Sequence, residues 1–332
     1  MIEMLKHLAK LRRSCRTTLT VAFTLSLAGG VANAAVVAFE RTTAGQPTFN
    51  RALEDFSALS GVGTAVSYDV QSFTVDASGE YSFVGNSTFD SFFYLYQGAF
   101  DATMPLSNGL AANDDLSGFG TSGVAYDLVA GQEYFAVMTA FNNAEFGEFA
   151  LSVAGPGEVA GLSSNAASDQ VAILSGATGG ASMFNRALDD FSGLSGVGTG
   201  VAYDVVEFTV AASGAYALTT VSEFDAFLFL YGGFDATSPL TNGLFGNDDL
   251  VSLASSGGTA DLLAGVTYQA VITGFTNNDF GDYVLTLAGP SDIDFAASGV
   301  IPEPSSWAVM ILGLASIGAM ARRRRDGKTV SF

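Results

Sequence analysis

The sequence predicts an all-β protein: two tandem antiparallel β-sandwich domains of jelly-roll type, with an N-terminal signal peptide and one short C-terminal transmembrane helix. Apolar residues alternate with small or polar ones, as at Val66, Tyr68 and Val70, and this period of two indicates half-buried strands. Glycine-rich segments separate such runs, which is typical of short strands joined by turns. A long stretch also occurs twice, because residues 49–64 recur as residues 184–199 with only two differences.

The first 34 residues have the three parts of a signal peptide. Basic residues between Lys6 and Arg16 precede an apolar run from Thr17 to Ala28, and Ala32 and Ala34 then provide the small residues that signal peptidase recognises. We expect cleavage after Ala34. A retained membrane helix is the weaker alternative, because about a dozen apolar residues are too few to span a bilayer.

The remaining body, residues 35–301, has an unusually narrow chemistry. It contains no Cys, His or Lys, and its three arginines face 30 acidic residues, so its formal charge is −27. Such a surface repels nucleic acid and anionic lipid and attracts cations. The absence of cysteine excludes disulfides and thiol nucleophiles, and the absence of histidine excludes histidine-based triads and ordinary zinc sites.

The repeat in the body is a domain duplication. Its offset is 135 residues at first and 134 residues later, which is far longer than the period of about 20 to 50 residues in solenoid repeats. A segment rich in Gly, Ser and Ala lies between the copies and is typical of a linker. The predicted domains are residues 1–34 (signal peptide), 35–156 (sandwich 1), 157–170 (linker), 171–290 (sandwich 2), 291–300 (spacer), 301–326 (sorting signal) and 327–332 (cytoplasmic tail).

One strand of each copy is expected to lie at the centre of a sheet. Residues 92–96 and their counterparts 227–231 are apolar at every position, which indicates that both faces are covered. The apolar phase shifts between Val70 and Phe73, and this predicts a bulge or bend in a long strand.

The order of motifs in each copy resembles the bacterial pre-peptidase C-terminal domain. The motifs are Phe-Asp-x-Phe-(Phe/Leu)-(Tyr/Phe)-Leu-Tyr from residues 89 and 224, then Asn-Asp-Asp, then Ala-Gly-x-x-Tyr, then Gly-x-(Phe/Tyr). The likeness covers residues 66–155 and 201–289. It implies a β-sandwich accessory module that binds or spaces, with no reason to expect catalysis, and some members of this family bind calcium.

Carboxylates and amides that recur in both copies form a candidate calcium site. Calcium takes six to eight oxygen ligands, which clustered Asp and Asn side chains provide together with loop carbonyls. The alternative is that these residues form Asx turns and bond to the backbone of their own loops. The candidate ligands are Asp90, Asn113, Asp114 and Asp115 in the first copy and Asp225, Asn247, Asp248 and Asp249 in the second.

Arg51 and Arg186 are the only arginines at equivalent positions of the two copies. A lone repeated cation in so acidic a body predicts a structural ion pair, and the nearest carboxylates in sequence are Glu54 and Asp55 in the first copy and Asp189 and Asp190 in the second. Ligand recognition by these arginines is the alternative.

The sequence favours a protein that is not an enzyme. Paired carboxylates are the one catalytic device left, so a glycoside hydrolase is a remote alternative. Two near-copies of an accessory sandwich, however, leave no residues for a separate catalytic domain. Carbohydrate binding stays open, although the single Trp307 lies outside the body and leaves only tyrosines as sugar platforms.

The C-terminal segment resembles the PEP-CTERM protein-sorting signal. Pro302, Glu303 and Pro304 directly precede an uncharged span that contains Trp307, and Arg322, Arg323, Arg324 and Arg325 follow it. The span, residues 305–321, has 17 residues and is about 25 Å long as a helix, so it can cross a bilayer only as a minimal anchor. The arginines are expected to stay cytoplasmic, and an ordinary tail anchor is the alternative.

These features together predict an exported, non-enzymatic protein of the cell surface or extracellular matrix. The resemblance implies transient anchoring in the inner membrane and processing by an exosortase near Pro302, in bacteria that make exopolysaccharide. The alternative is a calcium-dependent module that binds polysaccharide or protein. No nucleic-acid partner is expected.

Overall fold

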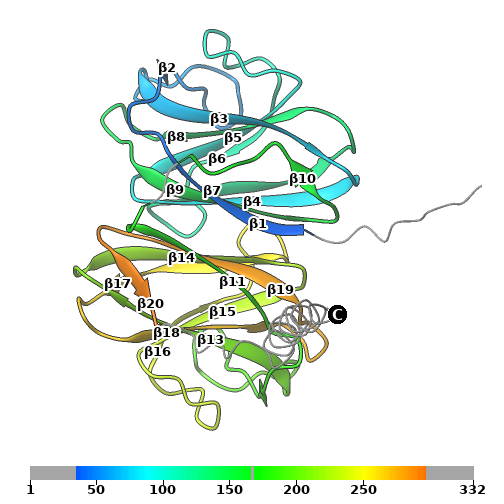
Figure 1. The fold of residues 1–332 in the computed structure, drawn as a ribbon, viewed down its shortest axis with the longest axis vertical. Helices are drawn as coiled ribbons and strands as arrows, with labels where there is room; N and C mark the ends of the chain where they lie inside the picture. Colours follow the sequence, from blue (N-terminus) through cyan, green and yellow to red (C-terminus); the bar gives the residue numbers. More distant parts are fainter. Residues whose placement is uncertain (1–34, 166–167, 297–332) are drawn as a thin grey trace, which may run out of the picture. The chain divides into compact units, whose positions relative to one another are not determined.

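A computed structural model describes residues 35–165 and 168–296 of the chain (Figure 1). Within these residues the chain forms strands, turns and loops and no α-helix, which confirms the all-β antiparallel prediction. The predicted signal peptide, its residues Ala32 and Ala34, and the predicted membrane helix at 305–321 lie outside the described residues. No helix among the described residues is long and apolar enough to cross a membrane.

Each copy contains ten strands in the same order. In the first copy they are β1 (Ala35–Thr42), β2 (Thr48–Phe49), β3 (Val66–Val75), β4 (Gly79–Ser87), β5 (Ser91–Gln97), β6 (Gly109–Asn113), β7 (Thr121–Leu128), β8 (Tyr134–Ala140), β9 (Glu148–Gly155) and β10 (Val159–Ala160). In the second copy they are β11 (Val171–Ala177), β12 (Met183–Phe184), β13 (Val201–Val210), β14 (Gly214–Ser222), β15 (Ala226–Tyr231), β16 (Gly243–Asn247), β17 (Ser255–Leu262), β18 (Tyr268–Gly274), β19 (Asp282–Ala288) and β20 (Ile293–Phe295).

The strands of each copy form two antiparallel sheets. The first copy has the orders β1-β9-β4-β7 and β10-β3-β8-β5-β6, and the second has β11-β19-β14-β17 and β12-β13-β18-β15-β16. Most consecutive strands lie in opposite sheets, so the chain wraps around the core as it does in a jelly roll. The two short strands β10 and β20, which lie in the segments expected to be linker and spacer, pair with β3 and β13.

The central strand β5 is buried on both faces. Phe93 and Leu95 enter the core between the two sheets. Phe92, Tyr94 and Tyr96 point the other way, into a second apolar cluster beneath the loop that follows β2. Counterpart residues of β15 divide between two clusters in the same way. Each such buried side chain contributes about 1.5–3 kcal/mol to stability, so β5 and β15 anchor both layers of their copies.

The bulge predicted between Val70 and Phe73 was wrong. The register of β3 on β8 is unbroken from Tyr68 to Phe73, and the shifts occur instead at the ends of the central strands, between Leu95 and Tyr96 and between Leu230 and Tyr231. The irregular apolar spacing has another cause: the buried positions before Phe73 are occupied by the polar residues Asp69 and Gln71, which accept hydrogen bonds from Arg41 and from the Ser163 amide.

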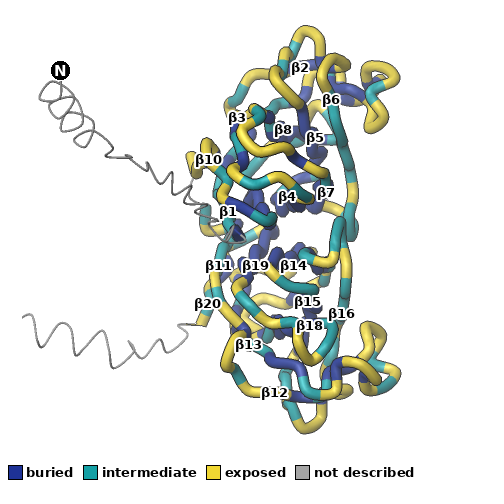
Figure 2. Tube along the Cα trace, turned by 90° about the vertical axis from the view of Figure 1, so that its right-hand side faces the viewer, coloured by how far each residue is buried: buried dark blue, intermediate teal, exposed yellow. Residues whose placement is uncertain are grey.

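The two copies contact each other through their sheets β1-β9-β4-β7 and β11-β19-β14-β17, and Figure 2 shows β1 and β4 next to β11, β19 and β14. Val84 and Ala154 of the first copy form one buried cluster with Val221 and Val284 of the second. Within this apolar contact Asn86 is fully buried, and its amide donates hydrogen bonds to the carbonyls of Ala217 at 3.1 Å and Thr286 at 3.0 Å. The hydroxyls of Ser82 and Ser252 also bond across this contact, at 2.5 Å. These directional bonds fix the register of one copy on the other.

An ion pair that the sequence did not predict ties three segments of the first copy together. Arg41 on β1 donates from Nε to Asp69 Oδ2 at 2.5 Å and from Nη2 to Asp69 Oδ1 at 2.8 Å. Its Nη1 donates to the carbonyl of Ser163 at 2.6 Å, so the residues after β10 are held against β1 and β3. Both charged side chains are buried, which makes this two-pronged bond a strong constraint.

The second copy holds the equivalent aspartate differently. The strand registers place Gly176 where the first copy has Arg41, and Tyr283 where it has Phe149. The Tyr283 hydroxyl donates to Asp204 Oδ2 at 2.7 Å. A Cβ on Gly176 would lie 2.4 Å from that hydroxyl, so the glycine makes room for the tyrosine. The pair Gly176 and Tyr283 in the second copy thus takes the place of the pair Arg41 and Phe149 in the first.

Candidate functional site

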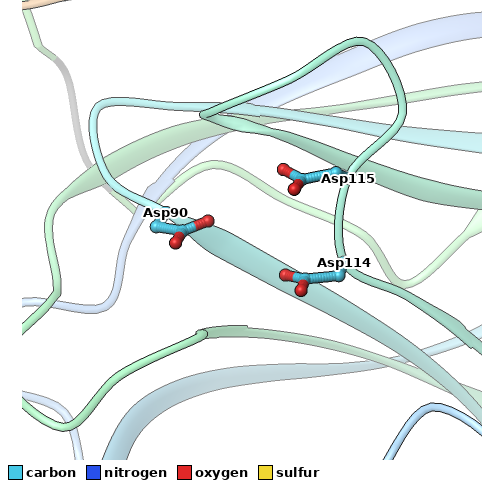
Figure 3. Close-up of side chains that lie close together, drawn as sticks. All are labelled: Asp90, Asp114 and Asp115. Carbon is cyan, nitrogen blue, oxygen red and sulfur yellow. The ribbon is translucent and has the colours of Figure 1, made fainter.

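Three aspartates meet at one end of β5 in the first copy. Asp90 directly precedes β5, and Asp114 and Asp115 directly follow β6 (Figure 3). One carboxylate oxygen from each lies within 4.8 Å of the others. The second copy repeats this arrangement with Asp225, Asp248 and Asp249. We call these two sets the carboxylate clusters.

Strand pairing brings the aspartates together. β5 and β6 are antiparallel neighbours, with Phe93 opposite Asn113, so the start of β5 lies beside the end of β6. The loop between β2 and β3 covers the outer face of β5, where its Ala52 and Phe56 pack against Tyr94 and Tyr96. The ring of Phe56 also lies close to Gly109 at the start of β6, so that a Cβ on that glycine would meet it at 2.2 Å. Phe56 has a φ of 56°, a strained value for a bulky residue, and its counterpart Phe191 repeats it with 57°.

None of the six clustered carboxylates accepts a hydrogen bond from the described residues. The Asx-turn alternative therefore does not apply to them, although it does apply to other aspartates of the loops, such as Asp55, which accepts from the Ser57 amide at 3.0 Å, and Asp101, which accepts from the Thr103 amide at 2.8 Å. Buried acceptor atoms without a partner include Oδ1 of Asp114, Asp225 and Asp248. Such atoms are expected to find a donor or a cation, because leaving them unpaired costs about 1–3 kcal/mol each.

The two asparagines of the candidate site behave differently from each other. Asn113 has a buried Oδ1 without a partner among the described residues, as the clustered aspartates have. Asn247 Oδ1 instead accepts a hydrogen bond from the Gly257 amide at 2.9 Å. Asn113 Oδ1 is therefore available to bind a cation together with the clustered aspartates, whereas Asn247 Oδ1 is already used in a hydrogen bond to the backbone.

The pKa values of the clustered carboxyls are raised. Burial, reinforced by Asp115 and Asp90, raises the pKa of Asp114 to about 7. Burial together with neighbouring carboxylates raises the pKa of Asp225 and of Asp248 to about 6, and it also raises the pKa of Asp90. Like charges crowded where water is partly excluded disfavour ionisation, so each cluster is suited to hold either protons or a cation.

The expected ion pairs of Arg51 and Arg186 were wrong. Both side chains are 2% exposed, and no carboxylate among the described residues lies within salt-bridge distance of either. Arg51 donates instead to the carbonyls of Phe141 and Ala52, both at 3.1 Å, and its guanidinium lies 4.4 Å from the centre of the Phe92 ring. Arg186 makes the equivalent contacts. Carbonyl bonds and aromatic faces satisfy the buried cation without a direct carboxylate.

Most tyrosines are not available as sugar platforms. Tyr81, Tyr94 and Tyr96 are fully buried, where their hydroxyls bond to backbone carbonyls, and only Tyr68, Tyr126 and Tyr203 are partly exposed. Among the described residues the strongly exposed aromatic side chains are phenylalanines, and Phe119 has the largest exposed fraction, 59%. Phe119 stands in a glycine-rich loop outside every repeated motif, so no repeated pattern points to it.

The C-terminal segment matches a known protein-sorting motif. Residues 300–325 match the PEP-CTERM protein-sorting motif. The chain carries a PEP-CTERM sorting signal. This result supports a PEP-CTERM protein, exported and sorted by an exosortase, as the sequence analysis expected. The residues that carry the motif, from Pro302 to Arg325, lie outside the described residues. The likeness of the two copies to pre-peptidase C-terminal domains stays a prediction.

Comparisons with whole proteins add little to this. No curated protein matches the chain. Among solved structures, an anti-sigma factor domain-containing protein is 11% identical, with 78% of this chain and 94% of that chain covered and a TM-score of 0.21. The glycosylasparaginase PNGase F from Flavobacterium meningosepticum is 10% identical, with 79% of this chain and 99% of that chain covered and a TM-score of 0.21. TM-scores this low carry no argument about fold or function.

Proposed function

We propose that this chain is an exported, non-enzymatic PEP-CTERM protein that an exosortase cuts near Pro302 and releases to the cell surface or extracellular matrix. The observation that carries the proposal is the match of residues 300–325 to the sorting motif. The N-terminal features of a signal peptide agree with it, because both ends of the chain then serve export. A body with neither Cys nor His, and with a charge of −27, suits a protein that works outside the cell, where it repels polyanions and attracts cations.

Mass spectrometry of the protein recovered from the host's surface and medium tests this proposal. We expect the mature chain to begin at Ala35 and to lack the four arginines at 322–325. In a strain without the exosortase, the same peptides should remain in the inner-membrane fraction. A surface protein that keeps its arginine cluster would contradict the processing step, and an unchanged distribution in the deletion strain would contradict the sorting step.

A second candidate function is calcium-dependent binding by the two copies. It is favoured by one observation: six carboxylates of the two clusters accept no hydrogen bond from the described residues, while other loop aspartates do. Three carboxylates offer up to six oxygens, and Ca²⁺ takes six to eight oxygens in flexible geometry. Asp90, Asp114 and Asp115 would hold the ion in the first copy, with Asn113 beside them.

Calorimetry distinguishes this candidate from a purely structural role. Calcium at about 100 times its dissociation constant is expected to stabilise the folded chain by about 2.7 kcal/mol for each occupied site. Asp114→Asn should remove the effect of the first site, and Asp248→Asn that of the second. Asp101→Asn is the matched control, because Asp101 lies in an Asx turn of the same copy and outside the cluster. If neither heat of binding nor a raised melting temperature appears in millimolar calcium, the clusters do not bind calcium.

A further inference from the structure

Two hollows lie where the copies meet, and the duplication relates them. The neutral hollow, of about 330 Å³, is lined by Thr88 and Phe119 of the first copy and by Ser213, Ala215 and other small residues of the second. The acidic hollow, of about 350 Å³, is lined by Glu80 of the first copy and by Glu223, Asp225 and Leu253 of the second. The repeat offset makes Ala215 the counterpart of Glu80, Glu223 that of Thr88 and Leu253 that of Phe119, so each hollow is built from equivalent positions with the two copies exchanged.

The two hollows have diverged in charge. Both carboxylates of Glu80 and Glu223 in the acidic hollow are replaced in the neutral one, by Ala215 and Thr88. No carboxylate lines the neutral hollow, although the body has 30 acidic residues. A hollow without charge on so acidic a molecule does not favour a cation over a neutral ligand.

The loop that carries Phe119 differs from its counterpart in the second copy. Glycines flank the phenylalanine, and both adopt positive φ, 112° at Gly118 and 85° at Gly120. A Cβ on Gly120 would lie 2.7 Å from the carbonyl oxygen of Ser87, so a larger residue does not fit there. The second copy has Ser252 and Ala254 at these positions and an ordinary backbone. Where the second copy has Leu253, the first copy therefore holds an aromatic ring, 59% exposed, at the wall of the neutral hollow. The acidic hollow is also lined by an aromatic residue, Phe224, which is half-buried.

Two polar side chains line the same hollow as this ring. The Ser213 hydroxyl accepts a hydrogen bond from the Ala264 amide at 2.9 Å, which leaves its own hydrogen free to donate. The Thr88 hydroxyl donates to the Glu148 carbonyl at 3.2 Å, which leaves its lone pairs free to accept. The neutral hollow thus offers an apolar face, one donor and one acceptor, in a volume within the range of small-molecule sites, about 300–1,000 Å³.

We infer that the neutral hollow binds a neutral sugar ring, a hexopyranose unit of a glycan, with one face of the ring against Phe119 and its hydroxyls on Ser213 and Thr88. A pyranose combines an apolar C–H face with a polar edge, which matches this distribution of groups. A charged sugar gains nothing there, because no opposite charge lines the hollow. The inference depends on neither calcium binding nor exosortase processing.

Titration calorimetry of the full chain, in EDTA, tests the inference with four neutral hexasaccharides, built of glucose, galactose, mannose or N-acetylglucosamine. We expect at least one to bind, and Phe119→Ala to weaken it about twofold to tenfold through loss of the aromatic contact. Ala215→Glu introduces into the neutral hollow the carboxylate that Glu80 provides in the acidic hollow, and it should abolish binding. Ala215 is exposed, so this change is not expected to disturb folding, and circular dichroism checks that it does not.

Two matched variants in the acidic hollow serve as controls. Leu253→Ala and Glu80→Ala change equivalent positions there, and both should bind the hexasaccharide as the unchanged chain does. The inference is overturned if none of the four sugars binds at concentrations up to about 10 mM, which corresponds to a free energy weaker than about −2.7 kcal/mol. It is equally overturned if Leu253→Ala weakens binding as much as Phe119→Ala, because the sugar would then lie elsewhere. The free hexoses, tested beside the hexasaccharides, show whether one ring alone is enough.

Discussion

Acidification is expected to release calcium from the two copies to different extents. A proton on a ligand carboxyl competes with the metal, so the apparent dissociation constant rises by a factor of 1 + 10^(pKa − pH) for each such group. With the pKa of Asp114 at about 7, lowering the pH from 8 to 6 should weaken the first site about tenfold. In the second copy Asp225 and Asp248 both have a pKa of about 6, and together they should weaken that site about fourfold.

Calcium affinity should rise with pH, whereas the free energy of unfolding without calcium should fall with pH. The folded pKa of these carboxyls is raised above the unfolded value, so their contribution to the free energy of unfolding is fully present below about pH 4. It is lost as the pH rises through about 6 and 7. In EDTA the free energy of unfolding should therefore fall from pH 5 to pH 8, as far as these groups determine it. In saturating calcium these carboxyls are deprotonated in the folded chain across the whole interval, so the free energy of unfolding should stay nearly constant, as far as these groups determine it.

Calorimetric titration at pH 6, 7 and 8, in two buffers with different enthalpies of ionisation, measures both the affinities and the protons released. About half a proton should leave the first site on binding at pH 7, and Asp114→Asn should remove this release. Asp101→Asn should leave it unchanged. Calcium affinities that do not vary between pH 6 and 8 would refute the account of the clusters as crowded, partly protonated carboxyls.

Two further predictions concern the buried polar bonds, and urea unfolding measures both. Asn86→Ala removes two buried hydrogen bonds to carbonyls of the second copy, so it should lower the free energy of unfolding by about 1–3 kcal/mol, while Asn278→Ala in an exposed loop should change it little. Arg41→Ala leaves a buried aspartate unpaired and should cost about 3–5 kcal/mol. Tyr283→Phe removes an uncharged donor from the equivalent aspartate and should cost about 1–3 kcal/mol. Equal losses in Arg41→Ala and Tyr283→Phe would contradict the difference in charge between the two arrangements.

Sequence patterns were sufficient for local structure. The alternation around Val66 and Tyr68 predicted strand β3, and the unbroken apolar run at 92–96 predicted a strand with two covered faces. The clustering of Asp90 with Asp114 was also predictable from the sequence, because the same residues recur in both copies beside the same strand. These signals depend on residues that are close in sequence or repeated at a fixed offset.

The features that were not predicted depend on contacts between residues far apart in the sequence, which leave no regular pattern of residue types. Arg51 was expected to pair with a carboxylate nearby in sequence, but it bonds to the carbonyl of Phe141, 90 residues away. The bond between Arg41 and Asp69 escaped notice because its second-copy equivalent uses a tyrosine, so it appeared in no repeated motif. The contact between the copies is made of small and β-branched residues that look like any outer face of a sheet.

Strand β1 has a consequence for the timing of export. Its first residue, Ala35, pairs with Gly155 on β9, which follows it by 120 residues. At a synthesis rate of about 5–20 residues per second, about 6–24 s pass between the emergence of the two partners. Ala35 is 6% exposed once they have paired, so a peptidase that cuts after Ala34 acts most easily within that interval. A secretion arrest before residue 155 would leave the newly freed N-terminus as a lone strand with nothing to pair with, and thus as a ready target for periplasmic proteases.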